Sequence, residues 1–186
     1  MDLVIAVTNR HLCSHPLTEQ IERICRLHPG SILLREKDLS ESDYKTLAQD
    51  VMKICETYRI PCILHTHMDV ARELNSSFLH LPLPLFRKYH EQTDGFAKVG
   101  TSVHSVEEAL EAEKLGASYL IAGHIYATDC KKGIPPRGPE FLRTVCQTVH
   151  LPVYAIGGIR LEEKQLQEVV GCGAAGGCIM SGMMSL

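Results

Sequence analysis

The feature that most constrains this chain is a regular alternation of short apolar runs with longer amphipathic stretches, repeated eight times. Near-continuous apolar runs favour strands of a parallel sheet that is covered by helices. The predicted strands are Leu3–Val7, Ser31–Leu34, Cys62–His65, Phe78–Leu81, Ala97–Gly100, Tyr119–Ala122, Val153–Ile156 and Gly177–Met180. Eight units close a barrel, so we predict a (β/α)8 TIM barrel as a single domain over residues 1–186. An open doubly wound sheet is the alternative.

Amphipathic stretches between these runs predict the outer helices. The clearest is Ser105–Leu115, because Ser105 stands three residues before Glu108, the spacing of a capping box, and Gly116 follows as a C-cap. The others are Leu17–Leu27, Tyr44–Tyr58 and Glu162–Val170, with the third and fourth helices of the barrel short. Only Ser181–Leu186 follow the last strand, so the eighth outer helix is expected to be missing or truncated. The apolar strip left exposed there would favour a homo-oligomer.

Composition excludes several classes of protein. With 45% hydrophobic residues the chain can bury a full core, and a net charge of −3 without a basic cluster argues against a nucleic-acid partner. The short apolar N-terminus lacks the basic region of a signal peptide, and no run is long enough for a membrane span. The eight cysteines form no CxxC pair, which favours reduced thiols and a cytoplasmic protein.

Polar residues follow the predicted strands at the end where barrel active sites lie. The candidates are Arg35 and Lys37 after the second strand, Ser102 after the fifth, His124, Thr128, Cys130 and Lys131 after the sixth, Gly157 and Gly158 after the seventh, and Met180, Ser181 and Gly182 after the eighth. Cationic, hydroxyl and imidazole groups on one rim suit an anionic small molecule. His65 and His67 also lie on this rim, and their role stays open.

Two glycine-containing loops predict a phosphate site. Loops after strands seven and eight of a barrel often bind phosphate, and glycine lets backbone N–H groups approach the oxygens. Here these loops contain Gly157-Gly158 and Ser181-Gly182. Either loop alone could be an ordinary tight turn, and the two together favour phosphate binding.

Several segments, in order and spacing, resemble the thiamine phosphate synthase superfamily over nearly the whole chain. They are Leu34–Lys37, Gly100–Ser105, Gly116–Tyr119, Gly123–Gly133, Ala155–Ile159 and Met180–Gly182. The resemblance implies a barrel that hosts one of two enzymes. Thiamine phosphate synthase joins a pyrimidine diphosphate to a thiazole phosphate and uses magnesium. The TenI-type thiazole tautomerase aromatises a thiazole phosphate carboxylate without a metal.

The motifs discriminate between these two enzymes. The synthase pattern places magnesium-binding aspartates after strands three and four, where this chain has His65-Thr66 and Leu81–Leu85. It also has Gly-Pro after strand six, where this chain has Gly123-His124. Magnesium depends on carboxylates and substrate phosphates, so the resemblance implies the tautomerase, with no metal and no cofactor.

The expected reaction is therefore an isomerisation of 2-carboxy-4-methylthiazole ethyl phosphate. His124 would move the proton, Thr128 and Lys131, or else Arg35, would hold the carboxylate, and the glycine loops would hold the phosphate. Two alternatives remain: thiamine phosphate synthase, and a non-catalytic regulatory protein that binds thiazole phosphate.

Overall fold

The computed structural model describes residues 1–186 and forms a closed eight-stranded barrel. All neighbouring strands pair in parallel in chain order, and β1 pairs with β8 to close the sheet. The strands are β1 Val4–Val7, β2 Ser31–Leu34, β3 Cys62–His65, β4 Phe78–Pro82, β5 Lys98–Val103, β6 Tyr119–Gly123, β7 Val153–Ile156 and β8 Gly176–Ile179. The (β/α)8 prediction is confirmed, and the open-sheet alternative is wrong.

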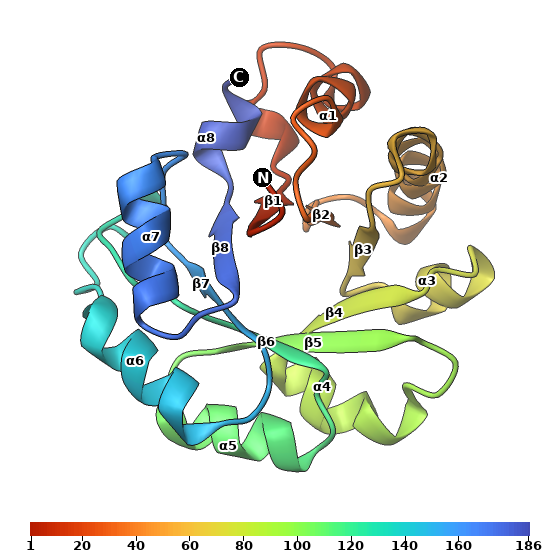
Figure 1. Cartoon of the computed structure of the whole chain (residues 1–186). Coiled ribbons are helices and arrows are strands. Elements are labelled where there is room, and N and C mark those ends of the chain that lie inside the picture. The colour runs from red at the N-terminus through yellow and green to blue at the C-terminus, as the bar shows by residue number, and fades with distance from the viewer.

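Helices surround this barrel on the outside (Figure 1). They are α1 Leu17–Cys25, α2 Glu41–Tyr58, α3 Met68–Glu73, α4 Leu83–Tyr89, α5 Val106–Lys114, α6 Gly138–Thr148, α7 Glu163–Gly171 and α8 Ser181–Met184, with short 3-10 turns η1 Arg10–Leu12, η2 His90–Gln92 and η3 Asp129–Lys131. The predicted cap of α5 is present, since the Ser105 side chain accepts a hydrogen bond from the Glu108 N–H. No helix is both long and apolar enough to cross a membrane.

Apart from shifts of one to three residues at other ends, one strand boundary and one helix differ from the prediction. Strand β5 continues to Val103 because Leu81 and Pro82 of β4 extend the pairing to Thr101 and Ser102. Helix α6 has no counterpart in the predicted set. Its sequence signals are the proline in its first turn and the buried pair Leu142 and Val145.

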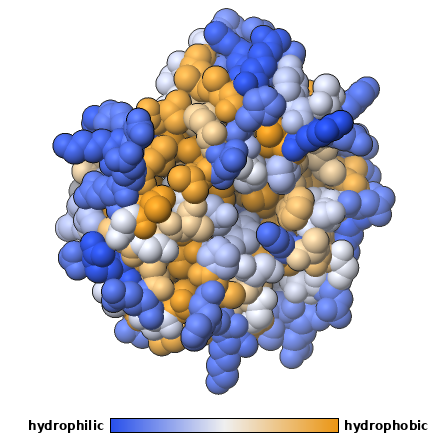
Figure 2. All heavy atoms as spheres, viewed as in Figure 1, coloured by the Kyte–Doolittle hydropathy of each residue, from blue (hydrophilic) through white to orange (hydrophobic).

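The eighth helix has a single turn, in agreement with the prediction of a truncated helix. Helix α8 lies between α7 and α1, where it contacts η1 (Figure 1). Leu12 of η1 and Leu186 after α8 are exposed, and Figure 2 shows apolar surface around this region. The predicted homo-oligomer remains a prediction.

The barrel interior is small and filled by side chains. A cluster of Ile5, Val7, Leu33, Ile63, Tyr119, Ile121 and Cys178 occupies it. The larger core lies between the outer face of the strands and the helices. Because these side chains fill the barrel interior, a small molecule can bind only at the rim formed by the strand ends.

Candidate active site

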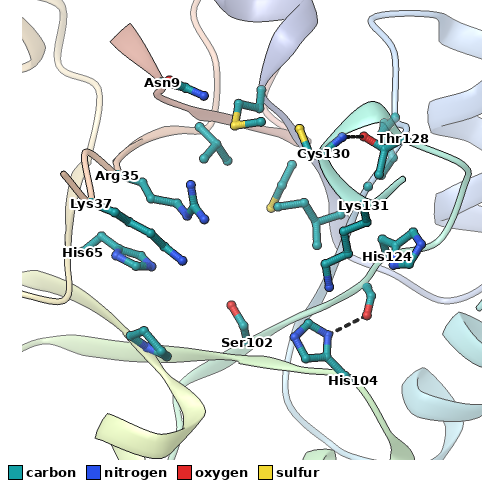
Figure 3. Close-up of a pocket in the computed structure, with 18 of the residues that line it drawn as sticks. Asn9, Arg35, Lys37, His65, Ser102, His104, His124, Thr128, Cys130 and Lys131 are labelled. Carbon is teal, nitrogen blue, oxygen red and sulfur yellow. Dashed lines mark hydrogen bonds between the residues drawn. The ribbon is translucent and has the colours of Figure 1, made fainter. Parts of the chain in front are cut away.

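A cavity of about 690 Å³ opens at the carboxyl ends of the strands (Figure 3). All eight strands, or the loops that follow them, contribute to its lining. This volume is in the range of roughly 300–1,000 Å³ typical of small-molecule sites. The cavity is therefore the candidate active site of the barrel.

Arg35 and Lys37 reach the cavity because the residue between them points away from it. The buried carboxylate of Glu36 accepts hydrogen bonds from Thr8 Oγ1 at 2.7 Å and from Arg10 Nη1 at 3.1 Å. Thr8 Oγ1 also accepts a hydrogen bond from the Arg35 N–H at 2.9 Å. These contacts fasten the exit of β2 to the exit of β1, and side-chain alternation then turns Arg35 and Lys37 inward.

Three of the four Arg and Lys side chains that line the cavity have no carboxylate partner. Arg87 pairs with Glu111 at 2.7 Å, whereas Arg35, Lys37 and Lys131 form no ion pair. In Figure 3, Arg35 and Lys37 extend from one side of the cavity and Lys131 from another. Burial lowers the pKa of Arg35, and burial together with the neighbouring Arg35 and Lys131 charges lowers the pKa of Lys37. Such a cluster favours an anionic occupant.

Two stacked histidines form the floor on the β3–β4 side. The ring centroids of His65 and His80 lie 5.6 Å apart. His80 Nδ1 is 3.1 Å from Tyr119 Oη, and its Nε2 is 2.9 Å from the Oγ of Ser102, which lines the cavity. Burial lowers the pKa of His65 to about 2 and that of His80 to about 3. Both rings are therefore neutral at pH 7, and His80 holds the Ser102 hydroxyl in place.

Tyr44 of α2 supports this floor from the helix layer. Its buried hydroxyl donates a hydrogen bond to the Leu34 carbonyl oxygen at 2.7 Å and accepts one from the His65 N–H at 2.9 Å. Leu34 directly precedes Arg35, so one hydroxyl fixes the backbone beside both Arg35 and His65.

His124 and His104 lie at the ends of β6 and β5. His124 is buried, and its Nε2 is 3.3 Å from the Ile134 carbonyl oxygen, which can only accept. Nε2 therefore carries the proton in the neutral ring, leaving Nδ1 as an acceptor. His104 Nδ1 is 2.7 Å from the Gly123 carbonyl oxygen (Figure 3). The His104 N–H donates to Glu108 Oε2 at 2.6 Å.

The loop after β7 presents backbone donors to the cavity. Gly157 and Gly158 have φ of 100° and 68°, a region that favours glycine, and both line the cavity. Their N–H groups donate no hydrogen bond within the chain. A Cβ on Gly157 would lie 2.3 Å from the Cβ of His124, and one on Gly158 would lie 2.4 Å from the Ala127 carbonyl oxygen. The two glycines are thus needed for loop packing as well as for donor access.

The donor set does not fit magnesium. Glu108 is the sole carboxylate that lines the cavity, and it accepts from the His104 N–H. The ends of β3 and β4 supply His65 and Pro82 instead of carboxylates, and no group of three His, Cys, Asp or Glu side chains is placed to hold a metal. Magnesium prefers oxygen ligands in octahedral geometry.

The structure brings eleven of the twelve predicted site residues to the cavity. Gly182 is the exception, because it lies within α8 and does not line the cavity. The roles of the other eleven remain predictions. Sequence reasoning missed Asn9, Tyr44 and His80. Asn9 had a signal, because it closely follows the first strand, whereas Tyr44 and His80 stand inside a helix and an apolar run.

Comparison with known proteins gives one family. A sequence profile described as thiamine monophosphate synthase matches residues 4–183. Thiamine-phosphate synthase 2 of Streptococcus pneumoniae is 36% identical over 185 residues, which cover 96% of this chain and 85% of that protein. Thiamine-phosphate synthase of Clostridium acetobutylicum is 34% identical and covers 98% of this chain and 87% of that protein.

Solved structures agree with the sequence relatives. Thiamine phosphate pyrophosphorylase from Pyrococcus furiosus superposes with a TM-score of 0.84 at 28% identity, covering 98% of this chain and 88% of that one. The corresponding protein from Bacteroides thetaiotaomicron, at 22% identity and a TM-score of 0.67, shares the fold.

These relatives overturn the predicted isomerase. They are named thiamine-phosphate synthases, not thiazole tautomerases, at 34–36% identity over almost the full chain. The tautomerase prediction depended on the missing magnesium carboxylates and on Gly123-His124. The resemblance to the superfamily itself is confirmed: the chain belongs to the thiamine monophosphate synthase family.

Proposed function

We propose that this chain is a transferase that joins a pyrimidine methyl diphosphate to a thiazole phosphate and releases inorganic diphosphate. In this reaction the thiazole nitrogen forms a bond to the pyrimidine methylene carbon, and the bond from that carbon to the diphosphate oxygen breaks. The bonding electrons leave with the diphosphate. Both substrates are anions, so the enzyme needs two separate anion-binding sets on one cavity.

The observation that carries the proposal is the presence of two such sets. The free N–H groups of Gly157 and Gly158 lie after β7, and the unpaired cations Arg35 and Lys37 lie after β2. Two phosphorylated substrates that bind side by side would occupy both sets. We assign the thiazole phosphate to the glycine loop and Ser181, and the diphosphate to the cations.

The remaining lining residues would orient the two rings between these anchors. Ser102, held by His80, can donate or accept a hydrogen bond, and His124 Nδ1 can accept one. Thr128, Cys130, Lys131 and Met180 close the cavity on the other side. Holding both reactants in attack geometry is the main catalytic contribution that such a site offers.

The test is direct coupling of the two substrates by the purified chain. Product thiamine phosphate is measured by chromatography and released diphosphate by an enzyme-coupled assay, in metal-free buffer and with Mg²⁺. Formation of both products in equal amounts supports the proposal. Saturable binding of both substrates without product under either condition would refute it and favour a non-catalytic ligand-binding protein.

A further inference from the structure

Unpaired cations line the cavity beside the ends of β3 and β4, where the synthase pattern would place magnesium-binding carboxylates. Arg35, Lys37 and Lys131 have no carboxylate partner, and the adjoining strand ends carry His65 and Pro82. We propose, building on the function above, that this chain binds the diphosphate through Arg35, Lys37 and Lys131 without a divalent cation, with His65 as an additional hydrogen-bond partner.

The charges of the lining residues support direct binding. The three cations line one cavity from two sides (Figure 3). The only lining carboxylate, Glu108, accepts a hydrogen bond from the His104 N–H. An arginine fork and two ammonium groups can neutralise a diphosphate by charge-assisted hydrogen bonds. A magnesium ion in the same place would add repulsion to the cations without gaining a carboxylate ligand.

The histidine floor is consistent with a metal-free subsite. The Nδ1 of His65 is 2.6 Å from Thr66 Oγ1, and its Nε2 has no partner within the chain. His65 lines the cavity beside Lys37 (Figure 3). Burial, together with the nearby Arg35 and Lys37 charges, lowers the pKa of His65, so the ring is uncharged and adds no repulsion to the cluster. An imidazole nitrogen is a poor ligand for Mg²⁺, which prefers oxygen.

The inference is tested with inorganic diphosphate alone, by calorimetry on the wild-type protein in metal-stripped buffer of constant ionic strength. We expect saturable binding without metal. Excess Mg²⁺ should weaken this binding several-fold, because the magnesium–diphosphate complex carries less negative charge. Binding that occurs only when Mg²⁺ is present would overturn the inference.

Variants locate the subsite. Arg35→Gln and Lys37→Gln should each weaken diphosphate binding on the order of tenfold to a hundredfold, the usual effect of losing a hydrogen bond to a charged group. Lys114→Gln is the matched control, since it removes one positive charge from the exposed end of α5. It should change affinity less than about twofold, because an exposed charge far from the site is screened by salt. Equal effects of Lys37→Gln and Lys114→Gln would contradict a localised site.

A third variant tests the role of the missing carboxylate. His65→Asp should weaken binding in metal-free buffer, because it adds a negative charge beside the cations. Mg²⁺ should then strengthen the binding instead of weakening it, since one carboxylate with substrate phosphates is a common magnesium site. If wild-type coupling proceeds but diphosphate binds only with Mg²⁺, the inference fails and the proposed function stands. Metal-free diphosphate binding without coupling would refute the proposed function and leave the metal-free subsite in place.

Discussion

Replacing Tyr44 by phenylalanine tests how the helix layer holds the active site. The change keeps the buried ring, which packs 4.4 Å from the His67 ring, and removes only the hydroxyl. Two hydrogen bonds are lost, at 2.7 Å to the Leu34 carbonyl oxygen and at 2.9 Å from the His65 N–H. Each is worth about 1 kcal/mol net, and an orphaned buried N–H costs about 1–3 kcal/mol. We expect the free energy of unfolding to fall by about 2–3 kcal/mol.

Urea denaturation followed by circular dichroism measures this loss, and Tyr58→Phe is the matched control. Tyr58 lies on the same helix, and its hydroxyl bonds Glu22 and Arg26 at the surface, so its loss should cost less than about 0.5 kcal/mol. Diphosphate affinity should fall in Tyr44→Phe alone, because its hydroxyl fixes the backbone beside Arg35 and His65. A Tyr44→Phe stability within about 0.5 kcal/mol of the wild type would refute the reasoning.

Three further predictions concern residues at the rim and floor of the cavity. Gly158→Ala should destabilise the fold and weaken thiazole phosphate binding, because the new Cβ would lie 2.4 Å from the Ala127 carbonyl oxygen. Gly133→Ala is the control: at a similar φ and with open space around it, the change should cost only the backbone strain of about 1–2 kcal/mol. His80→Gln should reduce the pH dependence of stability. In the unfolded chain His80 takes up a proton below about pH 6.5, whereas burial lowers the pKa of the folded ring to about 3. The free energy of unfolding of the wild type therefore falls as the pH is lowered. The variant should lose this contribution, which is about 1.4 kcal/mol per pH unit between about pH 6 and 4. His124→Gln should keep the fold and change the kcat of coupling. Wild-type kinetics in that variant would show that the His124 side chain has no role in the reaction.

Most strands could be predicted because both of their faces are buried. Such strands appear as apolar runs, and the turns between them are polar. Strand β5 was predicted too short because Thr101 and Ser102 are hydroxyl residues at its end, which are typical of a loop. Their strand conformation depends on pairing with β4 and β6, which no local pattern contains.

The site residues that could be predicted from the sequence are those that follow strands. Active sites of TIM barrels lie at the carboxyl ends of the strands, so the position of these residues is known before any contact is. The supporting contacts could not be predicted in this way. Glu36 meets Arg10 across 26 residues, and His80 meets Tyr119 across 39. An acidic residue in a charged loop and a histidine in an apolar run have many possible partners, and only the closed barrel selects among them.

The wrong isomerase prediction has a physical explanation. The residues at the ends of β3 and β4 determine whether the cavity can hold Mg²⁺. The isomerase prediction used the same residues to decide which bond the enzyme makes. Bond formation depends instead on which two groups the cavity brings together. The glycine loop and the Arg35–Lys37 pair can anchor two anions on different parts of the rim, and a reaction between two anchored anions does not require that their charge be neutralised by a metal. Under the function proposed above, the absence of these carboxylates would change how the diphosphate is neutralised and not which bond is made.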